Sequence, residues 1–230
     1  MKKIGKLIVI DGSDGSGKTT QATMIVKRLR RDGHAVRTMH FPQYQVNLIG
    51  TLIEECIAGE HGDFLHSDPH IASVLYAADR FESKVKIEKW LNEGAIVVLD
   101  RYVSANQIHQ GGKIKDAQKR KAFLKWLDKL EYGVFKLPRP NLTIFLHVPT
   151  PVSRKLIDDR NEVKVKAGKV ERRDTLEDDY SYLENAEQSA LLLLKSQKHW
   201  KRVECAKDGI LQTIENIHEK VYNFCRTTSD

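Results

Sequence analysis

Residues 12–19 read Gly-Ser-Asp-Gly-Ser-Gly-Lys-Thr and match the pattern G-x-x-x-x-G-K-[ST] at every defined position. The apolar run Ile4–Ile10 precedes them, and Thr19–Arg31 carries apolar residues at helical spacing. Glycines permit a tight loop whose backbone amides face phosphate oxygens, and the following helix adds its partial positive charge. Lys18 can then reach the β- and γ-phosphates of a nucleotide, and Thr19 can ligate magnesium. The stretch predicts a phosphate-binding loop between a strand and a helix.

Apolar strands alternate with amphipathic helices along the rest of the chain. Ala95–Leu99 is a continuous apolar run, which is typical of a strand buried on both faces. The alternation predicts a three-layer α/β/α fold with a five-stranded parallel sheet and a ligand site beyond the carboxyl ends of its strands. The remaining strands are expected at 35–41, 142–148 and 202–205. The remaining helices are expected at 47–58, 69–92, 101–110, 116–130, from 149–151 up to the polar stretch that begins at 161, 176–198 and 210–225.

The composition fits one globular domain over residues 1–230, with 40% apolar and 30% charged residues and no Pro/Gly/Ser-rich linker. The formal net charge of +7 suits a partner that carries phosphate. No stretch approaches the roughly 20 apolar residues of a membrane helix, and no basic groove is interleaved with aromatic residues. Cys56, Cys205 and Cys225 stand far apart, which fits a reducing compartment. We therefore expect a cytoplasmic protein with neither a membrane nor a nucleic acid as partner.

A second acidic position follows the third predicted strand. Asp100 ends the run Val97-Val98-Leu99-Asp100. Next to a phosphate-binding loop, an aspartate in this place helps to hold magnesium or its water shell. Asp100 and Thr19 are therefore the candidate metal ligands.

Several side chains predict an acceptor pocket, which a kinase needs and a hydrolase does not. Arg101 directly follows Asp100 and can clamp a phosphate group. Phe41 and Tyr44 close the second predicted strand. Tyr76 and Arg80 lie four residues apart on one helix face, where a ring could stack on a base and a planar donor could bond its edge. The open alternative is that the aromatic residues belong to the core and that Arg80 is a surface charge.

Residues 161–175 are almost all polar or charged. The stretch holds Lys164, Lys166, Lys169, Arg172 and Arg173, and Arg160 comes just before it. We predict a basic lid over about 158–176 that closes over phosphates, excludes water and stabilises the charge of the transition state. The alternative is a solvated basic loop.

Taken in order, these motifs resemble the thymidylate kinase family over nearly the whole chain. The resemblance rests on Asp14 in the phosphate loop, Phe41-Pro42, residues 59–63, Leu75–Arg80, Asp100-Arg101-Tyr102, Gln110-Gly111, Leu137–Leu142, and Arg173-Asp174 with Glu177. It implies transfer of the γ-phosphoryl group of ATP to the 5′-phosphate of dTMP, which gives dTDP. Magnesium is the implied cofactor, and relatives are commonly homodimers.

The resemblance also implies site residues. The implied ATP site comprises Gly12, Ser13, Asp14, Gly15, Ser16, Gly17, Lys18, Thr19 and Thr20. In the implied dTMP site, Asp14 faces the sugar 3′-hydroxyl, Arg101 and Tyr44 contact the phosphate, and Phe41 also belongs to the site. Around the base, Tyr76 stacks on thymine, Arg80 bonds the exocyclic oxygen, and Asn106 and Gln110 lie at the base edge. The implied catalytic residues are Lys18, Asp14, Arg101, Arg172 and Arg173.

Departures from the family pattern qualify three of these roles. Gly15 fills the loop position where some relatives have the catalytic arginine, so the lid must supply it from Arg172, Arg173 or Arg160. Gln43 and Tyr44 stand where many relatives carry an arginine. His109 replaces an aromatic residue that crowds the 2′ carbon of the sugar, so the exclusion of ribonucleotides is expected to be looser.

Two rival kinases remain open. A deoxynucleoside kinase needs a general base near the 5′-oxygen and has Glu-Arg where this chain has Asp100-Arg101. A broader pyrimidine nucleoside monophosphate kinase is compatible with His109. A GTPase switch is disfavoured, because the sequence has neither N-K-x-D nor D-x-x-G after the third strand.

Overall fold

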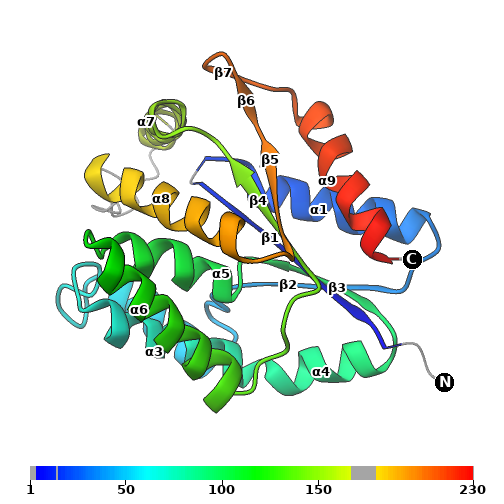
Figure 1. Cartoon of the computed structure of the whole chain (residues 1–230), viewed down its shortest axis with the longest axis horizontal. Coiled ribbons are helices and arrows are strands. Elements are labelled where there is room, and N and C mark those ends of the chain that lie inside the picture. The colour runs from blue at the N-terminus through cyan, green and yellow to red at the C-terminus, as the bar shows by residue number, and fades with distance from the viewer. Residues whose placement is uncertain (1–3, 14, 167–179, 230) are drawn as a thin grey trace.

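The structure is a computed structural model that describes residues 4–13, 15–166 and 180–229. Five parallel strands form its central sheet in the order β2-β3-β1-β4-β5 (Figure 1). The strands are β1 (Lys6–Gly12), β2 (Val36–His40), β3 (Ile96–Asp100), β4 (Leu142–His147) and β5 (Trp200–Glu204). The predicted α/β fold with a five-stranded parallel sheet is confirmed.

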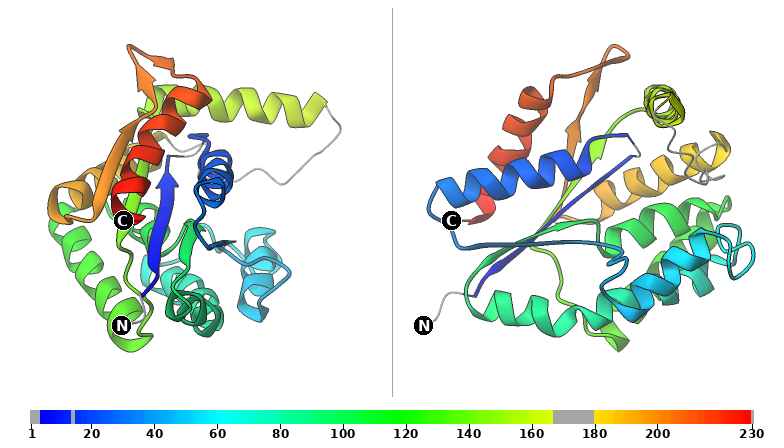
Figure 2. Two further views of the ribbon diagram at one scale, coloured as in Figure 1. Left: turned by 90° about the vertical axis from the view of Figure 1, so that its right-hand side faces the viewer. Right: turned by 180° about the vertical axis from the view of Figure 1, so that it is seen from behind.

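Helices cover both faces of the sheet because its side chains alternate between two apolar layers. On β1, Ile8 and Ile10 pack against α1 (Lys18–Arg31) and α9 (Ile214–Ser229), which lie together on one side (Figure 2). Leu7 and Val9 point to the other side, where α4 (Lys84–Asn92) contributes Ile87. The remaining helices of that side are α2 (Leu48–Ile57), α3 (Pro69–Glu82), α5 (Val103–Ala105), α6 (Ala117–Asp128) and α8 (Tyr180–Ser196).

Strand β1 lies in the middle of the sheet and pairs with β3 on one side and β4 on the other. The chain changes direction across the sheet at this point, and ligands of open α/β sheets bind outside such a switch point. The loop after β1 and the residues after β3 therefore meet at one edge. Among the described residues, none of the helices combines the length and apolar character that crossing a bilayer requires.

Three helix predictions were wrong in their extent. The helix predicted over 69–92 is interrupted at Ser83, where α3 ends and α4 begins. There, Asn47 Nδ2 donates to the Asp79 carbonyl oxygen, which an unbroken helix would pair with the Ser83 amide, and to the Ser83 hydroxyl. The helix predicted from residue 101 begins at Val103 and continues as a π-helix, η1 (Asn106–Gln110). The helix predicted to end at residue 130 continues as a second π-helix, η2 (Lys129–Val134).

Two further boundaries differ. Residues 158–166 of the predicted lid are the last turns of α7 (Thr150–Lys166), since polar residues such as Glu and Lys are also good helix formers. The rest of that lid, with Arg172 and Arg173, lies outside the described residues. The helix predicted from residue 210 starts at Ile214, because β6 (Ala206–Lys207) and β7 (Ile210–Leu211) form a hairpin around Asp208-Gly209. Asp-Gly is a strong hairpin signal that the helical reading overlooked.

Candidate active site

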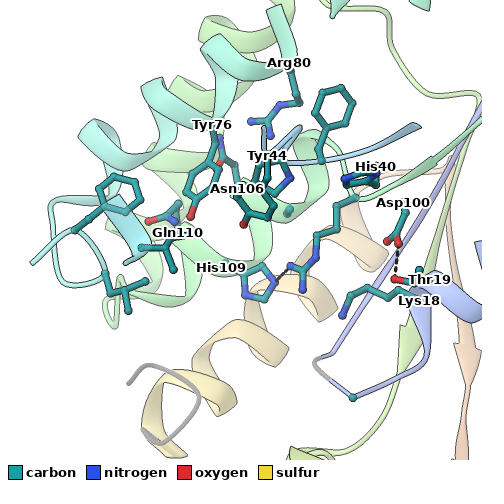
Figure 3. A pocket seen from close by; sticks show the side chains of 18 of the residues that line it. Lys18, Thr19, His40, Tyr44, Tyr76, Arg80, Asp100, Asn106, His109 and Gln110 are labelled. Atoms are coloured by element: carbon teal, nitrogen blue, oxygen red, sulfur yellow. Dashed lines mark hydrogen bonds between the residues drawn. The ribbon is translucent and has the colours of Figure 1, made fainter. Parts of the chain in front are cut away.

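A cavity of about 750 Å³ opens at the carboxyl ends of β1, β2 and β3 (Figure 3). It brings together most of the residues that the sequence assigned to nucleotide and acceptor binding. Those lining it are Gly15, Gly17, Lys18, Thr19, Thr20, Phe41, Tyr44, Tyr76, Arg80, Asp100, Arg101, Asn106 and Gln110. Of the described loop residues, Gly12, Ser13 and Ser16 are not among those lining it, and Asp14 lies outside the description.

Glycines give the phosphate loop its shape. Gly15 and Gly17 have φ angles of 75° and 80°, a left-handed conformation that costs glycine little. A Cβ on Gly12 would lie 2.5 Å from the Leu146 carbonyl oxygen of the neighbouring strand. The loop therefore needs a residue without a side chain both for its turn and for its approach to β4.

Lys18 opens helix α1 and is almost buried, with 8% of its surface exposed. Its ammonium group donates to the carbonyl oxygens of Gly12 at 3.1 Å and Ser13 at 2.9 Å. Gly17 precedes the helix and provides no side-chain cap for the first amides. These amides and the ammonium group make the loop a site for anions.

Thr19 and Asp100 come from different elements and meet directly. The Thr19 hydroxyl donates to Asp100 Oδ2 at 2.6 Å. Both are hard oxygen donors at the rim of the phosphate loop, and magnesium is usually held by one or two protein oxygens plus substrate phosphates and water. The pair fits a magnesium ion that is bound together with a nucleotide.

Arg101 is held at both ends. Its backbone has a φ angle of 65°, unusual for a residue other than glycine, and its amide donates to the Ile10 carbonyl oxygen of β1 at 3.0 Å. Its guanidinium Nη1 lies 2.8 Å from His109 Nε2, the dashed contact drawn at His109 in Figure 3. The other ring nitrogen of His109 lies 3.0 Å from the Tyr182 hydroxyl on α8.

Arg80 reaches the far end of the cavity in an ion pair that the sequence did not predict. Its Nε and Nη2 donate to the carboxylate of Glu131 at 2.7 and 2.5 Å, and Glu131 is fully buried. Burial by itself lowers the pKa of Arg80, but the charge and hydrogen bonds of Glu131 outweigh it and raise the pKa above its usual value. Arg80 is therefore not a surface charge but a permanently charged wall of the cavity.

Two side-chain amides line the cavity near Arg80, and they differ in their hydrogen bonding. Asn106 donates to Glu131 Oε1 at 2.9 Å and to the Ser73 carbonyl oxygen at 3.1 Å. Gln110 is buried, yet its Oε1 has no hydrogen-bond partner among the described residues. A buried acceptor without a partner is costly, so Gln110 offers a site for a donor on a ligand.

Aromatic rings form the apolar walls. Tyr76 lies 5.8 Å from Phe64, and Phe41 lies 5.8 Å from Tyr102, measured between ring centroids. Phe41 is 4% exposed and belongs to the core beside β3, so the core interpretation of this residue is right even though it lines the cavity.

A buried network fixes the loop that carries Tyr44. Asp79 accepts from the Gln43 amide at 3.0 Å and from Asn47 Nδ2 at 2.8 Å. Burial raises the pKa of Asp79, although these hydrogen bonds oppose the rise. The backbone amide of Gln43 thus helps to hold the loop to α3.

Sequence reasoning assigned no role to several residues that the structure places in or behind the cavity, among them Glu131, Asp79, His109 and Tyr182. Glu131 acts through Arg80 and belongs to no motif. Asp79 holds the Tyr44 loop, and it lies within the stretch Leu75–Arg80, which gave this residue no role of its own. His109 was noted only as a departure, and Tyr182 was not noted. Gly112 follows the predicted Gln110-Gly111 pair, and a Cβ on it would lie 2.8 Å from Ala186, so α8 packs directly on this segment.

Comparison with known proteins agrees with this arrangement. A family model for thymidylate kinase matches residues 10–220. A thymidylate kinase of Mycobacterium tuberculosis is 30% identical over 173 residues, which are 75% of this chain and 78% of the relative. A thymidylate kinase of Danio rerio is 27% identical over 217 residues, 94% of this chain and 88% of the relative. The human thymidylate kinase is 29% identical over 144 residues, 63% of this chain and 61% of the relative. The match over residues 10–220 makes this chain a member of the thymidylate kinase family.

Proposed function

We propose that this chain transfers the γ-phosphoryl group of ATP to the 5′-phosphate of dTMP, with ADP and dTDP as products. The observation that carries the proposal is the composition of this cavity: a phosphate-binding loop with Lys18 at one end, and Tyr76, Arg80 and Gln110 at the other. The first end suits a nucleoside triphosphate, and the second suits a planar base.

At the donor end, the loop amides and Lys18 hold the β- and γ-phosphates of ATP. The ammonium group would exchange its present contacts with Gly12 and Ser13 for phosphate oxygens. Thr19 and Asp100 would hold magnesium, which neutralises charge on the phosphates when it is bound. Thr20 and the remaining loop residues complete the ATP site.

At the acceptor phosphate, Arg101 and Tyr44 orient the attacking oxygen in line with the γ-phosphate. Phosphoryl transfer depends mainly on such positioning and on charge stabilisation. Asp14 would face the sugar 3′-hydroxyl, and Arg172 or Arg173 would add positive charge to the transferred group. These last three assignments rest on the family resemblance alone.

At the base, Tyr76 provides a ring for stacking and Arg80 a donor for the exocyclic oxygen of thymine. Glu131 uses Nε and Nη2 of Arg80, and Nη1 has no acceptor among the described residues, so it remains for the ligand. The open Oε1 of Gln110 matches the N3–H donor of thymine. Asn106 supports Glu131 with its amide group and presents its carbonyl oxygen.

We also propose a homodimer. Helices α2, α3 and α4 expose apolar side chains that are 40–78% accessible, namely Leu48, Ile71, Val74, Phe81 and Val85. A second copy of the chain would cover this patch. Cys56, Cys205 and Cys225 are buried thiols, which supports a reducing compartment such as the cytoplasm.

Gln110→Met tests the base site without removing a contact within the protein. With ATP and dTMP, the wild-type enzyme should form ADP and dTDP in equal amounts. Because Met keeps the volume of Gln, the variant should be at least as stable, while its KM for dTMP should rise about tenfold and its KM for ATP should change less than twofold. Ser73→Ala is the matched control, because the Ser73 hydroxyl is also buried without a partner among the described residues but does not line the cavity. An unchanged KM for dTMP in Gln110→Met, or no dTDP from the wild type, would contradict the proposal.

A further inference from the structure

The last residue of β2 presents an imidazole to the cavity. His40 is exposed and lines the cavity, and Figure 3 shows it near Asp100 at the edge of the sheet. It is the register partner of Asp100 on β3, so the two side chains extend to the same face of the sheet. Neither ring nitrogen of His40 has a hydrogen bond or an ion pair within the described part of the chain. The imidazole is therefore available to a ligand of the cavity.

The neighbouring Gln43 cannot take this role, because its side chain is turned inward. Gln43 is 6% exposed and is not among the residues lining the cavity. Its Nε2 donates to the His40 carbonyl oxygen at 2.5 Å, and its backbone amide donates to Asp79 Oδ2 at 3.0 Å. Among residues 40–44, the side-chain nitrogen donor that faces the cavity is thus the imidazole of His40, on a backbone that Gln43 fixes.

The order of the strands places His40 on the acceptor side of the cavity. In the sheet order β2-β3-β1-β4-β5, β3 lies between β2 and β1, and β1 leads into the phosphate loop. Arg101 follows β3, and Phe41 continues β2 with an amide that donates to the Asp100 carbonyl oxygen at 2.9 Å. The ends of β2 and β3 are therefore held together. His40 lies beside the segment of Arg101 and one strand further from the loop proposed to bind ATP.

We propose that His40 is a further binding residue for the acceptor: a ring N–H of His40 donates to the 5′-phosphate, which Arg101 contacts from the neighbouring strand end. This inference rests on the proposed function, because that function places the acceptor phosphate at Arg101. A phosphate monoester presents three acceptor oxygens, of which one guanidinium can occupy two. An imidazole has at least one N–H in either protonation state, so it can serve the remaining oxygen. His40 thus helps to select an acceptor that already carries a phosphate.

Two ligands that differ only in the 5′-phosphate isolate this contact. In the absence of ATP, binding of dTMP is measured by calorimetry, and binding of thymidine by its competition with dTMP. His40→Ala should raise the Kd of dTMP about tenfold or more, the usual loss for a hydrogen bond to a charged group, and should change the Kd of thymidine less than about twofold. The Kd of a non-hydrolysable ATP analogue with magnesium should also change less than about twofold, because the loop that holds ATP follows β1.

Two further variants serve as controls. His34→Ala removes the same side chain just before the amino end of β2, where it does not line the cavity, and should leave the Kd of dTMP within about twofold of the wild type. His40→Arg restores nitrogen donors and should keep the Kd of dTMP within about threefold of the wild type. Melting temperatures of all variants are compared to exclude unfolding.

Four results would overturn the inference: equal increases in the Kd of dTMP and thymidine in His40→Ala, an increase for the ATP analogue as large as that for dTMP, an unchanged Kd of dTMP, or a His40→Arg variant that binds dTMP as weakly as His40→Ala. In each of these cases the proposed function stands if the wild type converts ATP and dTMP to ADP and dTDP. A wild-type enzyme that makes no dTDP would overturn the proposed function, and the inference would fall with it.

Discussion

Replacing Glu131 with Gln should lower the free energy of unfolding by about 3–5 kcal/mol, because it leaves the Arg80 guanidinium charged and buried without a counter-ion. The side chains of Arg80 and Glu131 are 2% and 0% exposed, so water cannot replace the lost carboxylate. A loss of this size is a large share of the roughly 5–15 kcal/mol that stabilises a typical domain.

The chain provides its own control. Arg139 and Asp128 form a second two-pronged arginine–carboxylate pair, with both contacts at 2.8 Å, but their side chains are 59% and 40% exposed. Removing the charge by Asp128→Asn should cost no more than about 1 kcal/mol, because solvent screens an exposed pair. The comparison tests burial, since both pairs join a guanidinium to a carboxylate through two hydrogen bonds.

Urea unfolding of the wild type and both variants, followed by circular dichroism, measures the difference. The double replacement of Arg80 by Met and Glu131 by Leu should regain most of the stability, since no buried charge remains, yet its KM for dTMP should stay high. Losses for Glu131→Gln and Asp128→Asn that agree within about 0.5 kcal/mol would refute the view of this pair as a buried support of the base site.

Three further outcomes are expected. Lys18→Ala should lower turnover at least about a hundredfold in an ADP-release assay while the melting temperature is retained, and near-normal turnover would remove Lys18 from its role. Burial lowers the pKa of His147, but the hydrogen bonds that its ring nitrogens donate to the carboxylates of Glu187 and Glu204 outweigh this and raise the pKa above its usual value. The contribution of protonated His147 to stability is therefore full below about pH 6.5 and is lost as the pH rises through the raised pKa. The difference in free energy of unfolding between the wild type and His147→Gln should shrink from about pH 6 to pH 9. A difference that grows over this range would contradict the raised pKa. Gly50→Ala should destabilise the fold by about 1–3 kcal/mol in urea unfolding, because a Cβ there would lie 2.1 Å from a backbone carbonyl oxygen; an unchanged unfolding midpoint would contradict this.

The sheet could be predicted because each central strand is a local apolar run with a clear end. Ile8 and Val98 lie in such runs and are fully buried, as parallel strands between two helical layers must be. The break at Ser83 could not be predicted in this way, because a hydrogen bond from the distant Asn47 marks it. Strands of two residues, such as Ala206–Lys207, are too short for any periodicity to reveal.

The site residues also fall into those that the local sequence predicts and those that depend on distant contacts. Lys18 and Asp100 belong to motifs whose residues are neighbours in the sequence or follow a strand directly, and the fold brings such residues to one edge. Glu131 lies 51 residues from Arg80, just beyond the helix predicted over 116–130. Its role depends on a buried contact between two helical segments, and a single sequence contains no signal for such a contact.

The most direct test of the account is a coupled ADP-release assay of the wild-type enzyme with magnesium and ATP against dTMP, UMP, dCMP and thymidine. We expect kcat/KM for dTMP to exceed that for dCMP at least about tenfold, because Gln110 and Arg80 fit the N3–H and the C4 oxygen that cytosine lacks. It should exceed that for thymidine at least about a hundredfold, because the cavity offers Arg101 for a phosphate. It should also exceed that for UMP, which has the same hydrogen-bonding edge and differs by the 5-methyl group and the 2′-hydroxyl. Preference for thymidine would make the chain a nucleoside kinase, and equal use of dTMP and UMP would make it a broader pyrimidine monophosphate kinase. Either result would contradict the proposed specificity.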